Sequence, residues 1–79
     1  MKPQEYWYTI ILEPQPEGGY TVVVPALPGC ITEGDTKEEA LFMAKDAISG
    51  YIECLIEDGE PVPKDLPHRP EVESIKIVA

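Results

Sequence analysis

Acidic side chains are the most numerous groups in this sequence that could do chemistry. The chain of 79 residues carries 15 aspartate and glutamate residues and six lysine and arginine residues. Asp46 and Glu53 fall in one stretch with helical spacing, and paired carboxylates can hold a divalent cation for phosphoryl transfer. Acids at this density along a helix usually form a solvated face instead. A metal-dependent nuclease that needs Asp46 is therefore kept only as a third hypothesis.

Other reactive residues are few and isolated. His68 is the only histidine and stands in a proline-rich segment, whereas a general base needs a positioned partner. Ser49 and Ser74 are the only serines, and neither lies in the turn that exposes a serine nucleophile. One histidine and two separated cysteines give weak support for a zinc site. The sequence thus predicts a protein that is not an enzyme and uses no cofactor and no metal.

The two cysteines and the apolar pattern indicate a cellular compartment. Cys30 and Cys54 lie 24 positions apart and fit two reduced, partly buried thiols of a cytosolic protein. A disulfide between them stays as the alternative. No apolar stretch approaches the roughly 20 residues that span a bilayer. The N-terminal residues 1–5 are not followed by the apolar core of a signal peptide. We expect a cytoplasmic protein without membrane contact.

The charge balance favours a cationic partner. Fifteen acids minus six bases give a net charge of −9. Nucleic acid would be repelled, because its binding needs cations that displace counterions. A basic protein would be attracted and steered toward the chain. The alternative is that the acidity only keeps a small domain soluble.

Three strands and one helix follow from the residue pattern. Aromatic and β-branched residues favour strands at 6–12 and 20–24, and the glycines at 18 and 19 suit the turn between them. A short polar strand at 30–34 fits a sheet edge. Thr36 and Glu39 form a capping box, and apolar residues then recur every three or four positions as far as Leu55. A helix is therefore predicted at 37–58, ended by a left-handed Gly59.

The last third of the chain is predicted to contain a linker and a strand. Four prolines stiffen residues 61–70, and residues 71–78 read as a final strand that could pair beside the first. The whole is one domain over 1–79, with its core at about 5–60. The fold class is α+β, of order β-β-β-α-β, with one helix packed on a mainly antiparallel sheet. A domain this small buries only about 60% of its unfolded surface, so self-association into a homo-oligomer is expected.

A family pattern is carried by residues 25–40, Pro-Ala-Leu-Pro-Gly-Cys-Ile-Thr-Glu-Gly-Asp-Thr-Lys-Glu-Glu-Ala. Two strands joined by Gly-Gly-Tyr precede it, and Asp-Gly-Glu-Pro-Val-Pro at 58–63 follows it. Over about residues 5–65 the chain resembles the HicB antitoxins. The resemblance implies a partial ribonuclease H fold without the catalytic carboxylates. It also implies a partner, the small basic ribonuclease toxin HicA, whose catalytic histidine and RNA surface the antitoxin masks.

The functional hypotheses differ in the partner that the domain binds. Many HicB proteins carry a C-terminal DNA-binding domain, for which this sequence leaves no room, so direct nucleic-acid binding is not expected. The first hypothesis is an antitoxin-type binding module, and the alternative is a solitary self-associating structural or ligand-binding domain without a toxin. Trp7 and Phe42 could anchor a partner, or could instead pack under the 61–70 linker and the edge strand. The candidate partner-binding residues are Trp7, Glu33, Glu38, Phe42, Glu53 and Glu57.

Overall fold

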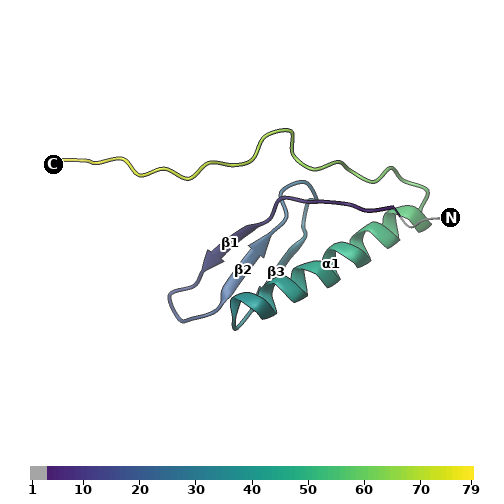
Figure 1. The fold of residues 1–79 in the computed structure, drawn as a ribbon, viewed down its shortest axis with the longest axis horizontal. Helices are drawn as coiled ribbons and strands as arrows, with labels where there is room; N and C mark the ends of the chain where they lie inside the picture. Colours follow the sequence, from purple (N-terminus) through teal and green to yellow (C-terminus); the bar gives the residue numbers. More distant parts are fainter. Residues whose placement is uncertain (1–3) are drawn as a thin grey trace.

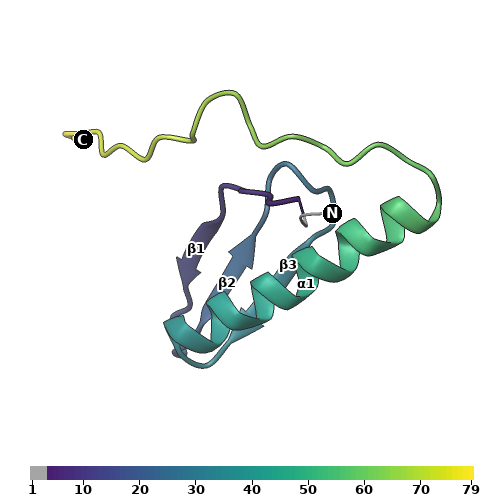
Figure 2. The same cartoon turned by 45° about the vertical axis from the view of Figure 1, so that its right-hand side comes forward.

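A three-stranded sheet with one helix on its face forms the folded body of the protein. The computed structural model describes residues 4–79. Its elements are β1 (Ile11–Pro14), β2 (Tyr20–Val23), β3 (Ile31–Gly34) and α1 (Lys37–Glu57). The strands pair antiparallel in the order β1-β2-β3, and α1 lies across β2 and β3 (Figures 1 and 2). The predicted α+β class is confirmed, and three strands followed by a helix are observed.

The ends of α1 are fixed by local hydrogen bonds. Thr36 is the N-cap, and its Oγ1 accepts from the Glu39 N–H at 3.1 Å. At the other end Gly59 has a φ of +69°, and the Glu60 N–H donates to the Leu55 carbonyl at 2.9 Å. The Gly59 N–H also donates to the Ile56 carbonyl at 3.1 Å, and these two hydrogen bonds form a Schellman ending. The predicted boundaries, 37 and 58, are therefore close to those observed. No helix within residues 4–79 is long and apolar enough to cross a bilayer.

The core lies between the sheet and the helix in two adjoining clusters. Val22 packs with Ala40 and Ala44, whose small side chains let α1 lie close to the sheet. Leu27 packs with Val24 and Cys30 beneath the second half of the helix. Both cysteines are free. Cys30 is buried in this core, whereas Cys54 is exposed, so the expectation of two partly buried thiols is wrong for Cys54.

The first strand is shorter than predicted and starts later. Residues 6–10 run past the end of β2 and join no ladder. The linker contacts them instead: the Tyr8 hydroxyl donates to the Pro63 carbonyl at 2.6 Å. The Thr9 N–H donates to Asp65 Oδ1 at 2.8 Å, and the Thr9 hydroxyl donates to Asp65 Oδ2 at 2.7 Å. We call these two bonds the Asp65 clamp, because they tie the linker to the segment before β1.

The final strand predicted at 71–78 is not formed in the single chain. Residues 71–79 belong to no strand, and all of them are exposed. After the Asp65 clamp the chain passes Pro67 and Pro70 and runs away from the sheet (Figures 1 and 2). A strand needs a neighbour that accepts and donates its backbone hydrogen bonds, and this segment has none beside it. The fourth strand of the predicted order is therefore missing from the monomer.

Candidate protein-binding surface

One face of α1 carries a continuous row of exposed, mostly acidic side chains. Helical spacing of three and four residues places them together, on the side of the helix away from the buried Ala40 and Ala44. We call this row the outer face of α1. Its members are Glu38, Phe42, Asp46, Ser49, Glu53 and Glu57, and all are exposed. Phe42 is 69% exposed, so most of its ring faces solvent.

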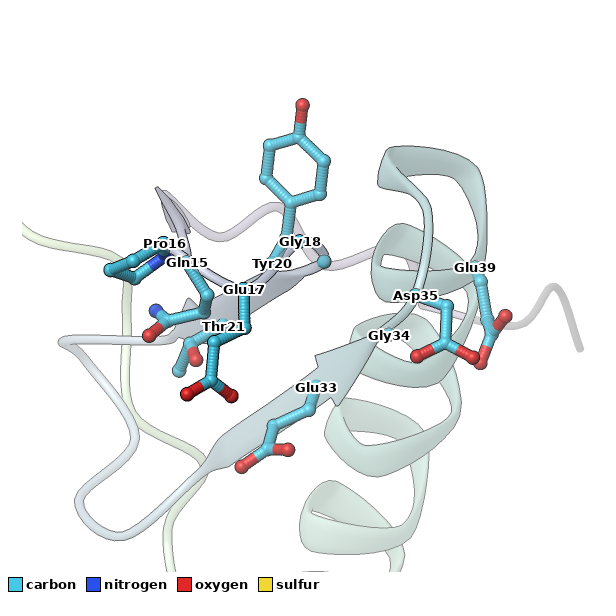
Figure 3. Close-up of a pocket in the computed structure, with 11 residues that line it drawn as sticks. Gln15, Pro16, Glu17, Gly18, Tyr20, Thr21, Glu33, Gly34, Asp35 and Glu39 are labelled. Atoms are coloured by element: carbon cyan, nitrogen blue, oxygen red, sulfur yellow. The ribbon is translucent and has the colours of Figure 1, made fainter.

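A second acidic feature lies where the β1–β2 turn, the end of β3 and the start of α1 meet. It is a surface hollow of about 470 Å³. Four carboxylates line it and point to the same side in Figure 3: Glu17, Glu33, Asp35 and Glu39. We call this the acidic hollow. No lysine or arginine is among the lining residues, so the hollow favours cationic groups.

Gly19 and Gly34 allow the β1–β2 turn, the end of β3 and the start of α1 to lie close together. A Cβ on Gly34 would lie 2.7 Å from the Ala40 Cα and would also collide with the Ala40 backbone nitrogen. A Cβ on Gly19, whose φ is +83°, would lie 2.8 Å from the Gly34 carbonyl oxygen. The β1–β2 turn, β3 and the first turn of α1 can therefore approach this closely only because both residues lack a side chain. The acidic hollow depends on this approach.

The sequence-predicted partner-binding residues fall into three groups. Four of them, Glu38, Phe42, Glu53 and Glu57, share the outer face of α1, and Glu33 lies in the acidic hollow. Trp7 stands apart on the segment before β1. It is 82% exposed, because the linker bonds to its neighbours Tyr8 and Thr9 and does not cover the indole. The structure thus groups five of the six residues around α1 and β3.

Sequence reasoning missed the partners of Glu33 in the acidic hollow. Glu17 precedes the glycines of a turn, and Asp35 and Glu39 flank the N-cap of α1. The sequence predicted the turn at 18 and 19, but the turn alone does not place Glu17 near the end of β3. That placement follows from the register between β2 and β3, in which Tyr20 lies opposite Gly34. The sequence alone did not provide this register.

The resolved pKa shifts lie away from these acidic surfaces. Hydrogen bonds from the Thr9 backbone and hydroxyl lower the pKa of Asp65. Burial, followed by the nearby Tyr6 and Asp65, raises the pKa of Tyr8. Burial also raises the pKa of the Cys30 thiol, which stays a neutral core group. Among residues 4–79 no three histidine, cysteine, aspartate or glutamate side chains gather as metal ligands would, and His68 is exposed in the linker.

These features define a small acidic α+β domain whose outer face suits contact with another macromolecule. Residues 8–75 match the protein family described as the HicB_like antitoxin of bacterial toxin-antitoxin systems. The chain belongs to this family, as its motifs indicated.

Relatives of two sizes share the domain. A UPF0150 protein of Thermoplasma acidophilum is 52% identical over 58 residues, which are 73% of this chain and 84% of the relative. A UPF0150 protein of Synechocystis is 48% identical over 62 residues, 78% of each chain. The antitoxin HicB of Escherichia coli K12 is 40% identical over 60 residues, 76% of this chain but 44% of the relative. The domain therefore occurs both in short proteins and as part of longer antitoxins.

Proposed function

We propose that this chain is a non-catalytic antitoxin domain that binds a small basic ribonuclease toxin of the HicA type and masks its active site. The observation that carries the proposal is the family match over residues 8–75, together with relatives named as HicB antitoxins. These relatives support an antitoxin role in general. The identity of the toxin and the masking of its active site are part of the proposal.

The acidic surfaces supply a physical reason for such a partner. The outer face of α1 presents acids on both sides of Phe42, and no other element of residues 4–79 covers it. A net charge of −9 steers a basic protein toward the domain. An exposed aromatic ring surrounded by charged residues matches the usual form of an interface anchor, which is desolvated at the centre of a polar rim. We therefore assign the toxin contact to the outer face of α1.

The direct test is a binding measurement with the small basic protein encoded beside this chain. Phe42→Ala is expected to weaken the complex by roughly tenfold or more, because anchors cost more than about 1.4 kcal/mol when truncated. Glu53→Lys should slow association and weaken its salt dependence. Glu60→Lys changes charge equally at an exposed position just beyond α1 and serves as the matched control, with a smaller effect. Absence of any complex at low salt would refute the proposal.

Self-association without a toxin is the second candidate, and the exposed C-terminal segment favours it. Residues 71–79 present apolar side chains to solvent, as an unsatisfied interface does. The neighbouring gene separates the two candidates: an adjacent small basic reading frame favours the antitoxin, and its absence favours a solitary domain. The two are compatible if toxin and second copy use different surfaces.

A further inference from the structure

The C-terminal segment carries four apolar side chains that the fold leaves uncovered. Val72, Ile75, Ile77 and Val78 are between 79% and 92% exposed. The radius of gyration is 15.4 Å and the longest dimension is 58 Å, whereas a compact domain of 79 residues has a radius of about 12 Å. The excess comes from this segment, which extends away from the sheet (Figure 1). An apolar segment held in this way needs a partner.

The residue pattern of this segment fits a strand with cover on both faces. In an extended strand alternate side chains point to opposite sides, so Ile75 and Ile77 share one face while Val72 and Val78 share the other. Glu71 and Glu73 share the first face, and Ser74 and Lys76 share the second, so each face carries two apolar side chains, and three of the four lie at the C-terminal end. The partner surface must therefore offer a free strand edge with apolar side chains on each side of it.

The outer edge of β1 offers such a place. β2 pairs with β1 on one side only, so half of the β1 backbone groups face an open edge. On the helix side this edge adjoins a hollow of about 350 Å³ lined by Tyr8, Ile10, Leu41 and Ile48. On the far side Trp7 and Ile11 line another hollow, of about 550 Å³, whose other wall is formed by the chain's own linker as far as Val72. Apolar side chains therefore lie on both sides of the free β1 edge.

The linker directs this segment away from its own β1. The Asp65 clamp fixes the chain beside Thr9, and Pro67 and Pro70 then lock φ in the bend that follows. Val72 still lines a hollow together with Ile11 and Leu12, and beyond it the chain continues outward instead of pairing with β1 (Figures 1 and 2). Short, constrained hinges of this kind favour exchange of an element between copies.

We propose that residues 71–78 form a fourth strand on the β1 edge of a second copy, and that the second copy does the same in return. One twofold exchange satisfies both free edges and covers both exposed segments, together with Trp7. This inference does not depend on a toxin. Of the outer face of α1, only Ser49 lines the hollow beside the β1 edge, so a dimer could still bind a toxin through the rest of that face.

The first experiment measures mass in solution by light scattering. The full chain of 8.8 kDa is expected at twice its own mass, and a chain that ends at Pro70 at its own mass. Ile77→Lys in the full chain should raise the dimer dissociation constant at least a hundredfold. Ala79→Lys adds the same charge two positions beyond, outside the proposed strand, and should leave the dimer intact. A monomeric full chain, or a dimer that survives both the truncation and Ile77→Lys, would overturn the proposal.

The second experiment asks which copy receives the strand. In a Cys54→Ser background, one chain carries Glu13→Cys on β1 and another carries a single cysteine at one of positions 73–76. Mild oxidation of the mixture should link the two different chains at one or more of these positions. When both cysteines are placed in one chain, the link should still join two chains. A disulfide formed only within one chain would show that the segment folds back on its own sheet and would contradict the exchange, as would the absence of any link at all four positions.

Discussion

Gly34 lies where the end of β3 meets the first turn of α1, and no side chain fits between them. It belongs to the Thr-x-Gly part of the family pattern. Gly29, with a φ of +80°, serves the turn in which the Cys30 N–H donates to the Leu27 carbonyl at 3.0 Å. Thr36 caps the helix. At each of these positions the residue of the family pattern therefore serves the fold itself.

A pair of glycine substitutions tests this explanation. Gly34→Ala is expected to lower the free energy of unfolding by about 1–3 kcal/mol, the usual cost of overpacking, because the new Cβ collides with the Ala40 backbone. Gly50→Ala is the control: it lies within α1 with nothing within 4 Å of the added Cβ, and should raise stability by about 1 kcal/mol. Urea unfolding measures both. Equal stability of Gly34→Ala and the unmodified protein would contradict the close approach.

At the scale of elements, the sequence predicted best those features that local residues decide. The limits of α1 follow from Thr36 and Gly59, which act through hydrogen bonds within a few residues. The outer face of α1 follows from helical spacing alone. The acidic hollow does not, because Glu17 and Glu33 meet only through the register of the sheet. The final strand is the extreme case, since its formation depends on a neighbour that is not adjacent in sequence.

The Asp65 clamp should release the linker in acid. Its Thr9 hydrogen bonds lower the pKa of Asp65 from the ordinary 3.8. A lowered folded-state pKa means that the clamp stabilises the fold above pH 3.8 and that this stability is lost as the pH falls through the lower folded value. The Thr9 amide proton signal should therefore titrate with a midpoint below 3.8.

Two substitutions at this position serve as controls for the clamp. Asp65→Asn keeps an oxygen that can accept from the Thr9 N–H but has no carboxyl to titrate, so the Thr9 signal should not move over the same pH range. Asp65→Ala removes the acceptor, and the Thr9 amide should then exchange, at every pH, as fast as an unprotected amide does at that pH. A midpoint at or above 3.8 in the unmodified protein would show that the two hydrogen bonds do not favour the carboxylate.

At the scale of the whole molecule, a small core is combined with a large exposed apolar segment. The buried apolar residues within 4–79 are seven: Val22, Val24, Leu27, Cys30, Ala40, Ala44 and Ile52. Three of the seven are alanine or cysteine, which bury little area. A core of this size provides only a few kcal/mol of stability. The fold therefore gains from every apolar side chain that a second copy can cover.

Exchange of strands makes stability depend on protein concentration. A tenfold rise in concentration favours a dimer by about 1.4 kcal/mol, or about 0.7 kcal/mol for each chain. At about 4–8 °C per kcal/mol for a domain of this size, the midpoint of thermal unfolding should rise by roughly 3–6 °C for each tenfold step. The chain that ends at Pro70 cannot exchange residues 71–78, so its midpoint should be lower and the same at every concentration. Calorimetry over a hundredfold range makes the comparison. A full-length protein whose midpoint does not move over that range folds as an independent monomer, and its exposed valines and isoleucines would then contribute nothing to its stability.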